Sequence, residues 1–180
     1  MGHGVNGAFT RYVVVRRPDQ VYHIPAGLPL EEAALCEPFA AAVQAVTEVT
    51  QVRIGDTALI SGPGPIGLLC LKLLVAEGVK TIVAGTARDG AKLALAQRIG
   101  AAGIVNVDEN RLFDEVQKET SGRGVDVALE CAGHPDSVRN CLEALRPMGH
   151  STQVAICGRE ITFPIDHIDS MTQWLNSPMK

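Results

Sequence analysis

Ser61-Gly62-Pro63-Gly64-Pro65-Ile66-Gly67 has the spacing G-x-G-x-x-G and lies between an apolar strand pattern at 57–60 and an apolar helix pattern at 66–77. In that context the first glycine permits the tight turn out of the strand. The second lets a pyrophosphate approach the backbone, and the third lets helix and strand pack closely. The stretch therefore predicts a dinucleotide-binding loop, with an ordinary glycine turn as the alternative.

The helix after the glycines is predicted to present its N-terminus to the phosphates. Proline suits the first helical turn because its missing N–H has no intrahelical partner to lose there. The free N–H groups and the positive end of the helix dipole favour a bound anion. From this loop we predict five cofactor-binding residues: Gly62, Gly64, Pro65, Ile66 and Gly67.

Downstream of Gly55 the sequence repeats a pattern of strand, glycine and helix. Such alternation predicts right-handed βαβ units and an α/β fold, a doubly wound parallel sheet covered on both faces. A further strand at 161–165 is weakly indicated, and 166–180 has no clear period, so we expect a loose tail there. The expected strands are 57–60, 81–84, 104–107, 125–129 and 153–157, and the expected helices are 66–77, 90–99, 112–120 and 135–145.

The first segment of the chain has a different sequence pattern from the rest. Residues 8–15 and 21–24 are β-rich and are separated by Arg17-Pro18-Asp19-Gln20, which has turn chemistry. They predict two antiparallel strands. Short helices are expected at 30–35 and 39–49, interrupted by Cys36-Glu37-Pro38.

The amino-acid composition limits the classes of function that this chain can have. The chain has 180 residues, 46% hydrophobic and 20% charged, with a net charge of −4. Scattered basic residues give no nucleic-acid-binding face, and no apolar stretch is long enough for a membrane span. The five cysteines are odd in number, form no C-x-x-C pair and fit a reducing compartment. We therefore expect a cytoplasmic protein with neither nucleic acid nor membrane as a partner.

A set of short motifs, in order and at these spacings, resembles the zinc-dependent medium-chain dehydrogenases, most closely the sorbitol, threonine and alcohol dehydrogenase type. The resemblance implies a Rossmann domain at 38–165, a β-rich remnant of a GroES-like catalytic domain at 1–37 and a tail at 166–180. The motifs are Gly7-Ala8-Phe9, Leu30-Glu31-Glu32-Ala33-Ala34, Glu37-Pro38, Gly55-Asp56, Gly62–Gly67, Gly100-Ala101, Gly124-Val125-Asp126 and Glu130-Cys131-Ala132-Gly133.

The family chemistry implied is hydride transfer between NAD or NADP and an alcohol or polyol, with a zinc ion polarising the substrate oxygen. Glu37 aligns with the family's acidic residue at that zinc, and a surface carboxylate is the alternative role. The other zinc ligands of the family have no counterpart here. We expect a chain truncated at both ends and catalytically incomplete, with zinc not retained and no catalytic residue assigned.

The family strand order is 3-2-1-4-5-6, but the sixth strand is doubtful because Asp169-Ser170-Met171-Thr172-Gln173 has poor strand character. An unpaired fifth strand would favour self-association, so a homo-oligomer is expected. Two alternatives to a dehydrogenase remain open. One is a dinucleotide-binding module without catalysis. The other is a methyltransferase, which has no use for the Glu37-Pro38 and Glu130–Gly133 motifs.

The remaining predicted cofactor contacts lie at the ends of later strands. Gly85 occupies the position where an NAD-preferring Rossmann domain normally has an acid, so the sequence favours tolerance of NADP. Thr86 offers a hydroxyl, and Arg88 and Lys92 offer positive charge for a 2′-phosphate, or are only solvated residues of a helix start. The family resemblance implies that five further residues contact the nicotinamide, although they could instead be small residues that allow close packing. They are Cys131, Ala132, Gly133, Ile156 and Cys157.

Overall fold

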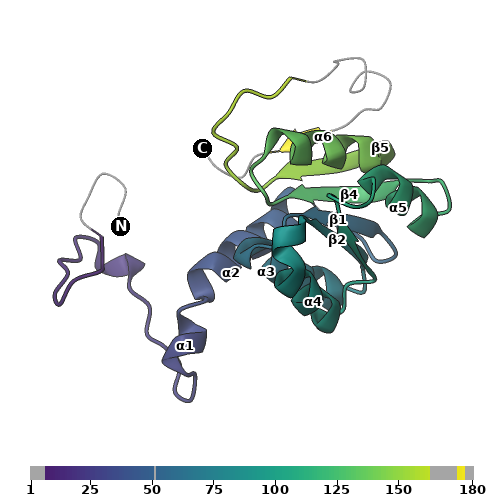
Figure 1. Cartoon of the computed structure of the whole chain (residues 1–180). Helices are drawn as coiled ribbons and strands as arrows, with labels where there is room; N and C mark the ends of the chain where they lie inside the picture. The colour runs from purple at the N-terminus through teal and green to yellow at the C-terminus, as the bar shows by residue number, and fades with distance from the viewer. Residues whose placement is uncertain (1–6, 51, 163–173, 177–180) are drawn as a thin grey trace. The chain divides into compact units, whose positions relative to one another are not determined.

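The computed structural model describes residues 7–50, 52–162 and 174–176. The chain divides into two compact units, Met1–Leu35 and Cys36–Lys180. The second unit contains the sheet, its covering helices and the glycine loop (Figure 1).

The described part of the first unit contains a 3₁₀ turn, Pro18–Gln20, and a short helix, α1 (Leu30–Ala33). It contains no strand, so the two antiparallel strands predicted at 8–15 and 21–24 are wrong for these residues. An isolated two-stranded hairpin is marginal in water unless a further strand or helix covers its apolar side.

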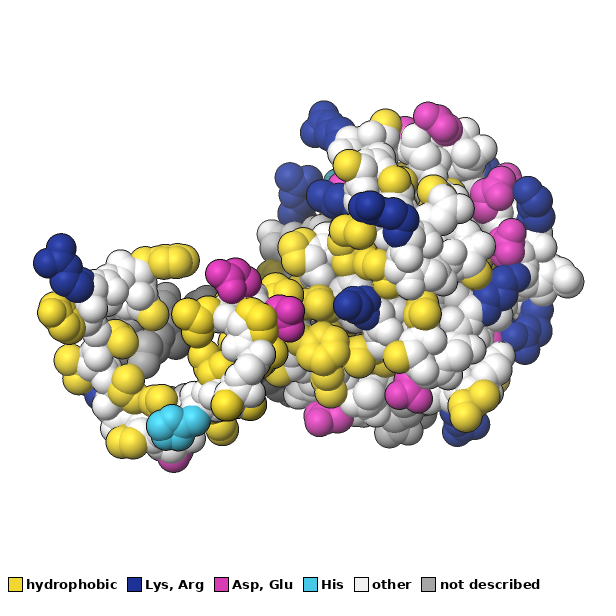
Figure 2. Space-filling model, turned by 90° about the horizontal axis from the view of Figure 1, so that it is seen from below, with side chains coloured by type: hydrophobic (Ala, Val, Ile, Leu, Met, Phe, Trp, Pro, Cys, Tyr) yellow, Lys and Arg dark blue, Asp and Glu magenta, His cyan; other side chains and the backbone are white. Residues whose placement is uncertain are grey.

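The apolar side chains of this unit lack such cover. Phe9, Tyr12, Val14 and Tyr22 are each more than four-fifths exposed. Figure 2 shows hydrophobic side chains gathered over the surface of the N-terminal unit. The β-rich composition is present, but within the described residues nothing packs against it to form a sheet.

The second unit is built on one parallel sheet with the strand order β3-β2-β1-β4-β5-β6. The expected doubly wound α/β fold and the order 3-2-1-4-5 are confirmed. The strands are β1 (Thr57–Ser61), β2 (Lys80–Gly85), β3 (Gly103–Asn106), β4 (Val125–Glu130), β5 (Leu145–Gln153) and β6 (Trp174–Asn176).

Helices cover both faces of this sheet, α3 and α4 on one and α5 and α6 on the other (Figure 1). The boundaries of the four helices lie close to those expected from the 3.6-residue period. They are α3 (Pro65–Ala76), α4 (Gly90–Ile99), α5 (Leu112–Glu119) and α6 (Pro135–Ala144), preceded by α2 (Cys36–Val43) and the π-helical segment η2 (Gln44–Val49), with a 3₁₀ turn, η3 (Ala87–Asp89), before α4.

Two apolar cores lie on the two sides of the sheet. Ile60 packs with α3 and α4, whereas its neighbour Leu59 packs with α5 and α6, as alternation along a strand requires. Both side chains are fully buried. Strands buried on both faces explain why these segments read as continuous apolar runs rather than alternating ones.

Two expected boundaries are wrong. Cys36-Glu37-Pro38 does not interrupt a helix but forms the first turn of α2. Proline is tolerated there because a backbone N–H in the first turn has no intrahelical partner to lose. The last expected strand, 153–157, is also displaced, since β5 ends at Gln153. The backbone N–H groups of Val154 and Ala155 both donate to the Glu130 carbonyl, at 2.9 and 3.0 Å, so the parallel ladder stops there.

The doubt about a sixth strand is corrected by β6, which pairs in parallel with His150, Ser151 and Thr152 of β5. The β5 edge is therefore paired along these residues, which removes the stated reason for self-association there. Residues 174–176, which were expected to belong to a loose tail, form β6 instead, and the rest of that tail, Asp169–Gln173 included, lies outside the described residues. Ile161 and Thr162, the described part of the weakly indicated strand, form none.

Candidate functional site

The predicted cofactor residues, Glu37 apart, lie at or just beyond the carboxyl ends of the strands. β1 is central, with β2 on one side and β4 on the other. The chain order reverses between β1 and β4, and this switch point is where open α/β sheets leave a crevice for ligands.

Gly62 makes the turn out of β1 against the end of β4. Its φ is +105°, and a Cβ there would lie 2.6 Å from the Ala132 nitrogen. Its own N–H donates to the Ala84 carbonyl at 2.9 Å. Both the conformation and the close approach require glycine at this position.

Gly64 differs from Gly62 in having open space around it. Its φ is −71°, and a Cβ would meet no atom within 4 Å. Pro65 begins α3 immediately after it. Within the described part of the chain, the backbone N–H groups of Ile66 and Gly67 have no hydrogen-bond partner. A backbone exposed beside free helix N–H groups suits an anion such as a pyrophosphate.

Gly67 and Gly85 bring neighbouring elements close together. A Cβ on Gly67 would collide with the Gly62 carbonyl oxygen and lie 3.3 Å from Ile60 Cγ2. A Cβ on Gly85 would lie 2.9 Å from the Pro63 ring. The loop is thus packed against both β1 and β2, and only Gly64 leaves a face uncovered.

The end of β4 is held by the carboxylate of Glu130, a residue only 1% exposed. Its Oε1 accepts from the N–H groups of Ala132 and Gly133, both at 2.9 Å, and Gln153 Nε2 donates to Oε2 at 2.5 Å. The Ser137 hydroxyl donates to Oε1 at 2.6 Å. Four donors satisfy both oxygens, so the buried carboxylate fixes the 131–133 loop.

Sequence analysis placed Glu130 in a family motif but assigned it no role. The available signal was a carboxylate at the end of an otherwise apolar strand, since an acid is almost never fully buried without partners. Its hydroxyl partner Ser137 also lies 2.7 Å from the hydroxyl of Ser61, the last residue of β1. The network therefore joins the strands on which the two loops begin.

Gly133 brings the segment after β5 into the same place. Its φ is +69°, and a Cβ would lie 2.7 Å from the Ile156 carbonyl oxygen. Ile156 is 75% exposed, and Cys157 follows it directly. The predicted nicotinamide-side residues are thus neighbours, although both their binding role and the alternative of close packing remain predictions.

Two thiols near the site, those of Cys131 and Cys141, are poor nucleophiles. A hydrogen bond with Cys70, together with burial, raises the pKa of Cys131 well above its ordinary value. Burial also raises the pKa of Cys141. Because the thiolate is the reactive form of cysteine, neither residue is suited to act as a nucleophile.

The end of β2 leads into a polar turn. The Thr86 N–H and hydroxyl donate to Asp89 Oδ2 at 3.1 and 2.8 Å, and Lys92 Nζ donates to Asp89 Oδ1 at 2.8 Å. Lys92 is therefore already paired with a carboxylate. Arg88 is exposed and has no hydrogen bond or ion pair to the part of the chain that the structure describes.

Glu37 lies on the exposed first turn of α2. Among the described residues, no group of three or more histidine, cysteine, aspartate or glutamate side chains is arranged to hold a metal ion. A catalytic zinc ordinarily takes three protein ligands. Glu37 alone therefore does not provide the ligand set of a catalytic zinc ion.

In the described ranges, no helix is both long and apolar enough to cross a bilayer.

The parallel sheet, the glycine loop at its switch point and the helix that follows define a dinucleotide-binding fold. The chain belongs to the zinc-binding dehydrogenase family, whose model matches residues 65–174. This confirms the resemblance drawn from the motifs.

The chain is similar to sorbitol dehydrogenases. It is 32% identical to that of Halalkalibacterium halodurans, over 93% of this chain and 49% of the relative, and 38% identical to that of Bacillus subtilis, over 86% and 42%. Escherichia coli L-idonate 5-dehydrogenase has a similar structure, with 31% identity and a TM-score of 0.84 over 96% of this chain and 48% of that one. The chain spans about half the length of the curated relatives it matches.

Proposed function

We propose that the chain is the cofactor-binding part of a zinc-type alcohol or polyol dehydrogenase and binds a nicotinamide dinucleotide over Gly62–Gly67. The observation that carries this is the contrast within the loop, where Gly62 and Gly67 are packed and Gly64 is open. A plain glycine turn has no need to leave one backbone face bare beside free helix N–H groups. A dinucleotide pyrophosphate uses both features.

The residues divide the work of holding the cofactor. Gly64 and the N-terminus of α3 would receive the pyrophosphate, and the turn at 85–89 would receive the adenosine ribose. The 131–133 loop, fixed by Glu130, and the neighbouring Ile156 and Cys157 would enclose the nicotinamide side. The bound nicotinamide supplies the hydride chemistry, and this chain's residues orient it.

The substrate class follows from the relatives, which are named for sorbitol, arabitol phosphate and butanediol. A small alcohol or polyol is therefore the proposed substrate of the complete enzyme. Glu37 is a proposed contributor to its metal site, and residues 1–37 are proposed to belong to its catalytic domain. Further ligands would have to come from outside the described residues, so we expect this chain alone to turn over alcohol very poorly.

The test is a titration of the purified chain with NADH, in which binding is measured by fluorescence and by calorimetry. Micromolar binding is expected for the wild type, and Gly64→Val should abolish most of it without loss of fold. Gly90→Ala is a matched control, because Gly90 also has no atom within 4 Å of its Cβ position but lies at the start of α4. Equal NADH affinity in all three proteins would contradict the proposed loop. Binding of S-adenosylmethionine instead of NADH would favour a methyltransferase.

A dinucleotide-binding module without catalysis is the second candidate. It is favoured by the lack of a metal-holding cluster in the described part of the chain. Metal analysis of the purified chain, with turnover of sorbitol and butanediol, separates the two. Stoichiometric zinc with dehydrogenase turnover would exclude the module, whereas NADH binding without either would support it.

Self-association and cytoplasmic localisation remain proposals. The described β6 pairs with β5, so association would have to use another surface. Light scattering at several concentrations tests it.

A further inference from the structure

The last residue of β2 is not the aspartate or glutamate that NAD-preferring Rossmann domains have at this position. In an NAD-preferring Rossmann domain, a carboxylate there bonds the adenosine ribose hydroxyls and repels a 2′-phosphate. Here the last residue of β2 is Gly85. Packing explains the glycine, since a Cβ would lie 2.9 Å from the Pro63 ring and 3.2 Å from Asp89 Cβ. A side chain at Gly85 would displace the glycine loop.

The neighbouring strand brings a carboxylate to the same turn. Gly85 is in register with Asn106 at the end of β3, and its carbonyl accepts from the Val107 N–H at 2.9 Å. The next residue, Asp108, extends its side chain across the strand ends. Its Oδ2 accepts from the Ala87 N–H at 2.8 Å. A carboxylate from the residue two positions after β3 therefore lies at the backbone two residues beyond the end of β2.

The donors of this turn are already used by carboxylates. Asp89 takes the Thr86 N–H and hydroxyl, and Asp108 takes the Ala87 N–H. The bond from Lys92 is the largest cause of the lowered pKa of Asp89, with those from Thr86 adding to it and burial opposing them. Lys92 thus offsets Asp89, while Arg88 forms no ion pair within the described part of the chain.

We propose that Asp108 is the specificity-determining carboxylate of the adenosine end and that it selects NAD over NADP. The inference rests on the proposed function, since it concerns the same cofactor site. It replaces the tolerance of NADP expected from Gly85 alone. That expectation took Arg88 and Lys92 as charges available to a 2′-phosphate and did not include Asp108.

The physical reason is a balance of charge and donors. The four side chains Asp89, Lys92, Asp108 and Arg88 sum to zero charge, so the turn has no excess positive charge for a phosphate. A 2′-phosphate would bring one and a half to two negative charges beside Asp108 and would find the Thr86 and Ala87 N–H groups occupied. A ribose 2′-hydroxyl is neutral and can donate to a carboxylate oxygen.

The experiment compares the dissociation constants of NADH and NADPH for the wild type, Asp108→Asn and Glu109→Gln. Asp108→Asn removes the charge but keeps an oxygen that can accept the Ala87 N–H bond, so the turn is retained. Glu109→Gln removes an equally exposed neighbouring charge and is the matched control. Asp108→Ala is the second variant, used if the asparagine protein does not fold by circular dichroism.

We expect the wild type to bind NADH at least tenfold more tightly than NADPH. Asp108→Asn should reduce this ratio by about tenfold, or about 1.4 kcal/mol, mainly by tighter NADPH binding. Glu109→Gln should leave the ratio within about twofold. The wild-type preference should also shrink in high salt, because it is electrostatic.

Three outcomes are decisive against the proposal. Equal affinity of the wild type for the two cofactors, or a ratio unchanged by Asp108→Asn, would overturn the role of Asp108 while NADH binding leaves the proposed function standing. A shift of equal size in Glu109→Gln would reduce the effect to net charge and also overturn it. Failure of the folded wild type to bind either dinucleotide would instead overturn the proposed function itself.

Discussion

Strand β4 carries two buried carboxylates, one near each end, and they are satisfied in different ways. Asp126 is 6% exposed and accepts from Arg146 Nε at 2.6 Å and Arg123 Nη2 at 2.9 Å, besides the N–H and hydroxyl of Thr57. Glu130 is 1% exposed, and its donors are backbone N–H groups, a hydroxyl and an amide, all neutral.

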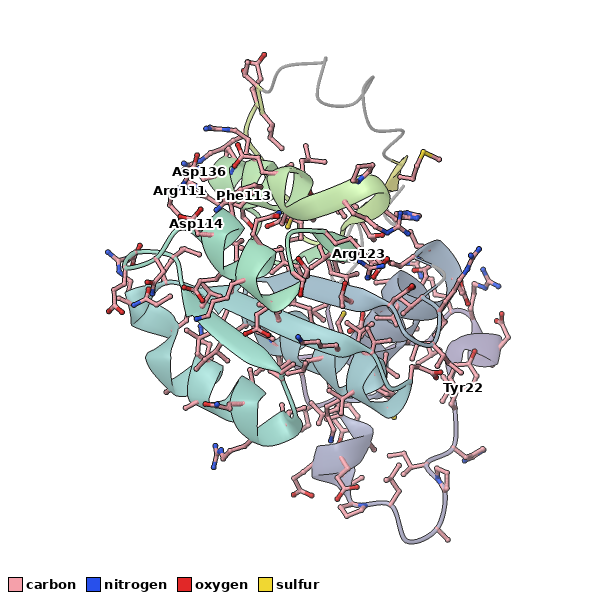
Figure 3. The ribbon with its side chains drawn as sticks, turned by 90° about the vertical axis from the view of Figure 1, so that its right-hand side faces the viewer. Tyr22, Arg111, Phe113, Asp114, Arg123 and Asp136 are labelled. Atoms are coloured by element: carbon pink, nitrogen blue, oxygen red, sulfur yellow. The ribbon has the colours of Figure 1, made fainter. Side chains whose placement is uncertain are left out.

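The difference gives the two carboxylates separate structural tasks along one strand, one in the sheet and one in a loop of the proposed cofactor site. The two arginines offset the charge of Asp126, and Arg146 of β5 and Thr57 of β1 tie β4 to both neighbouring strands at the end away from the glycine loop. Two of the four neutral donors around Glu130 are backbone N–H groups of the 131–133 loop, and the other two are side chains of α6 and of the end of β5. Figure 3 shows Arg123 on the opposite side of the unit from Asp136, which lies on the first turn of α6 just after the Glu130 loop.

The largest predicted effect is on stability, from Asp126→Asn. The change leaves Arg146 and Arg123 without their carboxylate and weakens the bonds from Thr57. Removing one partner of a buried pair costs about 3–5 kcal/mol, and partial exposure of both arginines reduces this to about 2–3 kcal/mol. Urea unfolding measures it. NADH affinity of the folded protein should stay within about twofold, and a tenfold loss would show that the two ends are not independent.

The second prediction reverses this pattern with Glu130→Gln, the corresponding acid-to-amide change at the other end. One carboxylate oxygen becomes an NH₂ that faces other donors, at a cost of about 1–3 kcal/mol. Because the 131–133 loop then loses its anchor, we expect roughly tenfold weaker NADH binding, measured by calorimetry at a temperature where the variant is folded. Unchanged affinity beside a stability loss would make Glu130 purely structural.

Sequence patterns predicted the second unit well because its signals are local. The expected helix 90–99 is observed without change as Gly90–Ile99, where Gly100 follows with a φ of +121°. The glycine loop was found because its spacing and its flanking strand and helix patterns all lie within one βαβ unit. The loop lies between the expected strand and helix, while the binding role of its residues stays a prediction.

The rest could not be predicted because it depends on contacts between distant segments. The network of Glu130 with Ser137 and Gln153, and the bond from Ala87 to Asp108, join residues that no period connects. The prediction placed β5 too late in the chain because the residues after Gln153 are apolar, as in a strand. The neighbouring strand β4 has already ended at that point, so these residues have no strand to pair with. The N-terminal segment has strand composition without a partner among the described residues.

A smaller effect on binding is predicted for Gly64→Ala. The backbone φ of −71° suits alanine and the Cβ meets nothing within 4 Å, so the free energy of unfolding should not fall. The methyl group would project toward the space proposed for the pyrophosphate. NADH affinity should fall by roughly three- to tenfold, at most about 1.4 kcal/mol. A lower free energy of unfolding with unchanged NADH affinity would show instead that Gly64 is needed for packing, as Gly62 and Gly67 are.

The smallest predicted effect is the pH dependence of the Asp126 contribution, because two causes oppose each other. Burial raises the pKa of Asp126, but the bonds from Arg146 and Thr57 and the charge of Arg123 outweigh it and leave the pKa below its ordinary value. A carboxyl with a lowered folded-state pKa contributes stability that is present above its unfolded value of about 3.9 and is lost as the pH falls through the folded pKa.

The difference in unfolding free energy between the wild type and Asp126→Asn should therefore be constant from pH 7 to about pH 5 and shrink below about pH 4. Asparagine does not titrate, so subtracting the values for the variant from those for the wild type removes the contribution of every other titrating group. Urea titrations of both proteins at each pH give this difference. A difference that stays constant down to pH 2 would mean that the arginines do not stabilise the ionised carboxylate, and the contrast between the two ends of β4 would then rest on Glu130 alone.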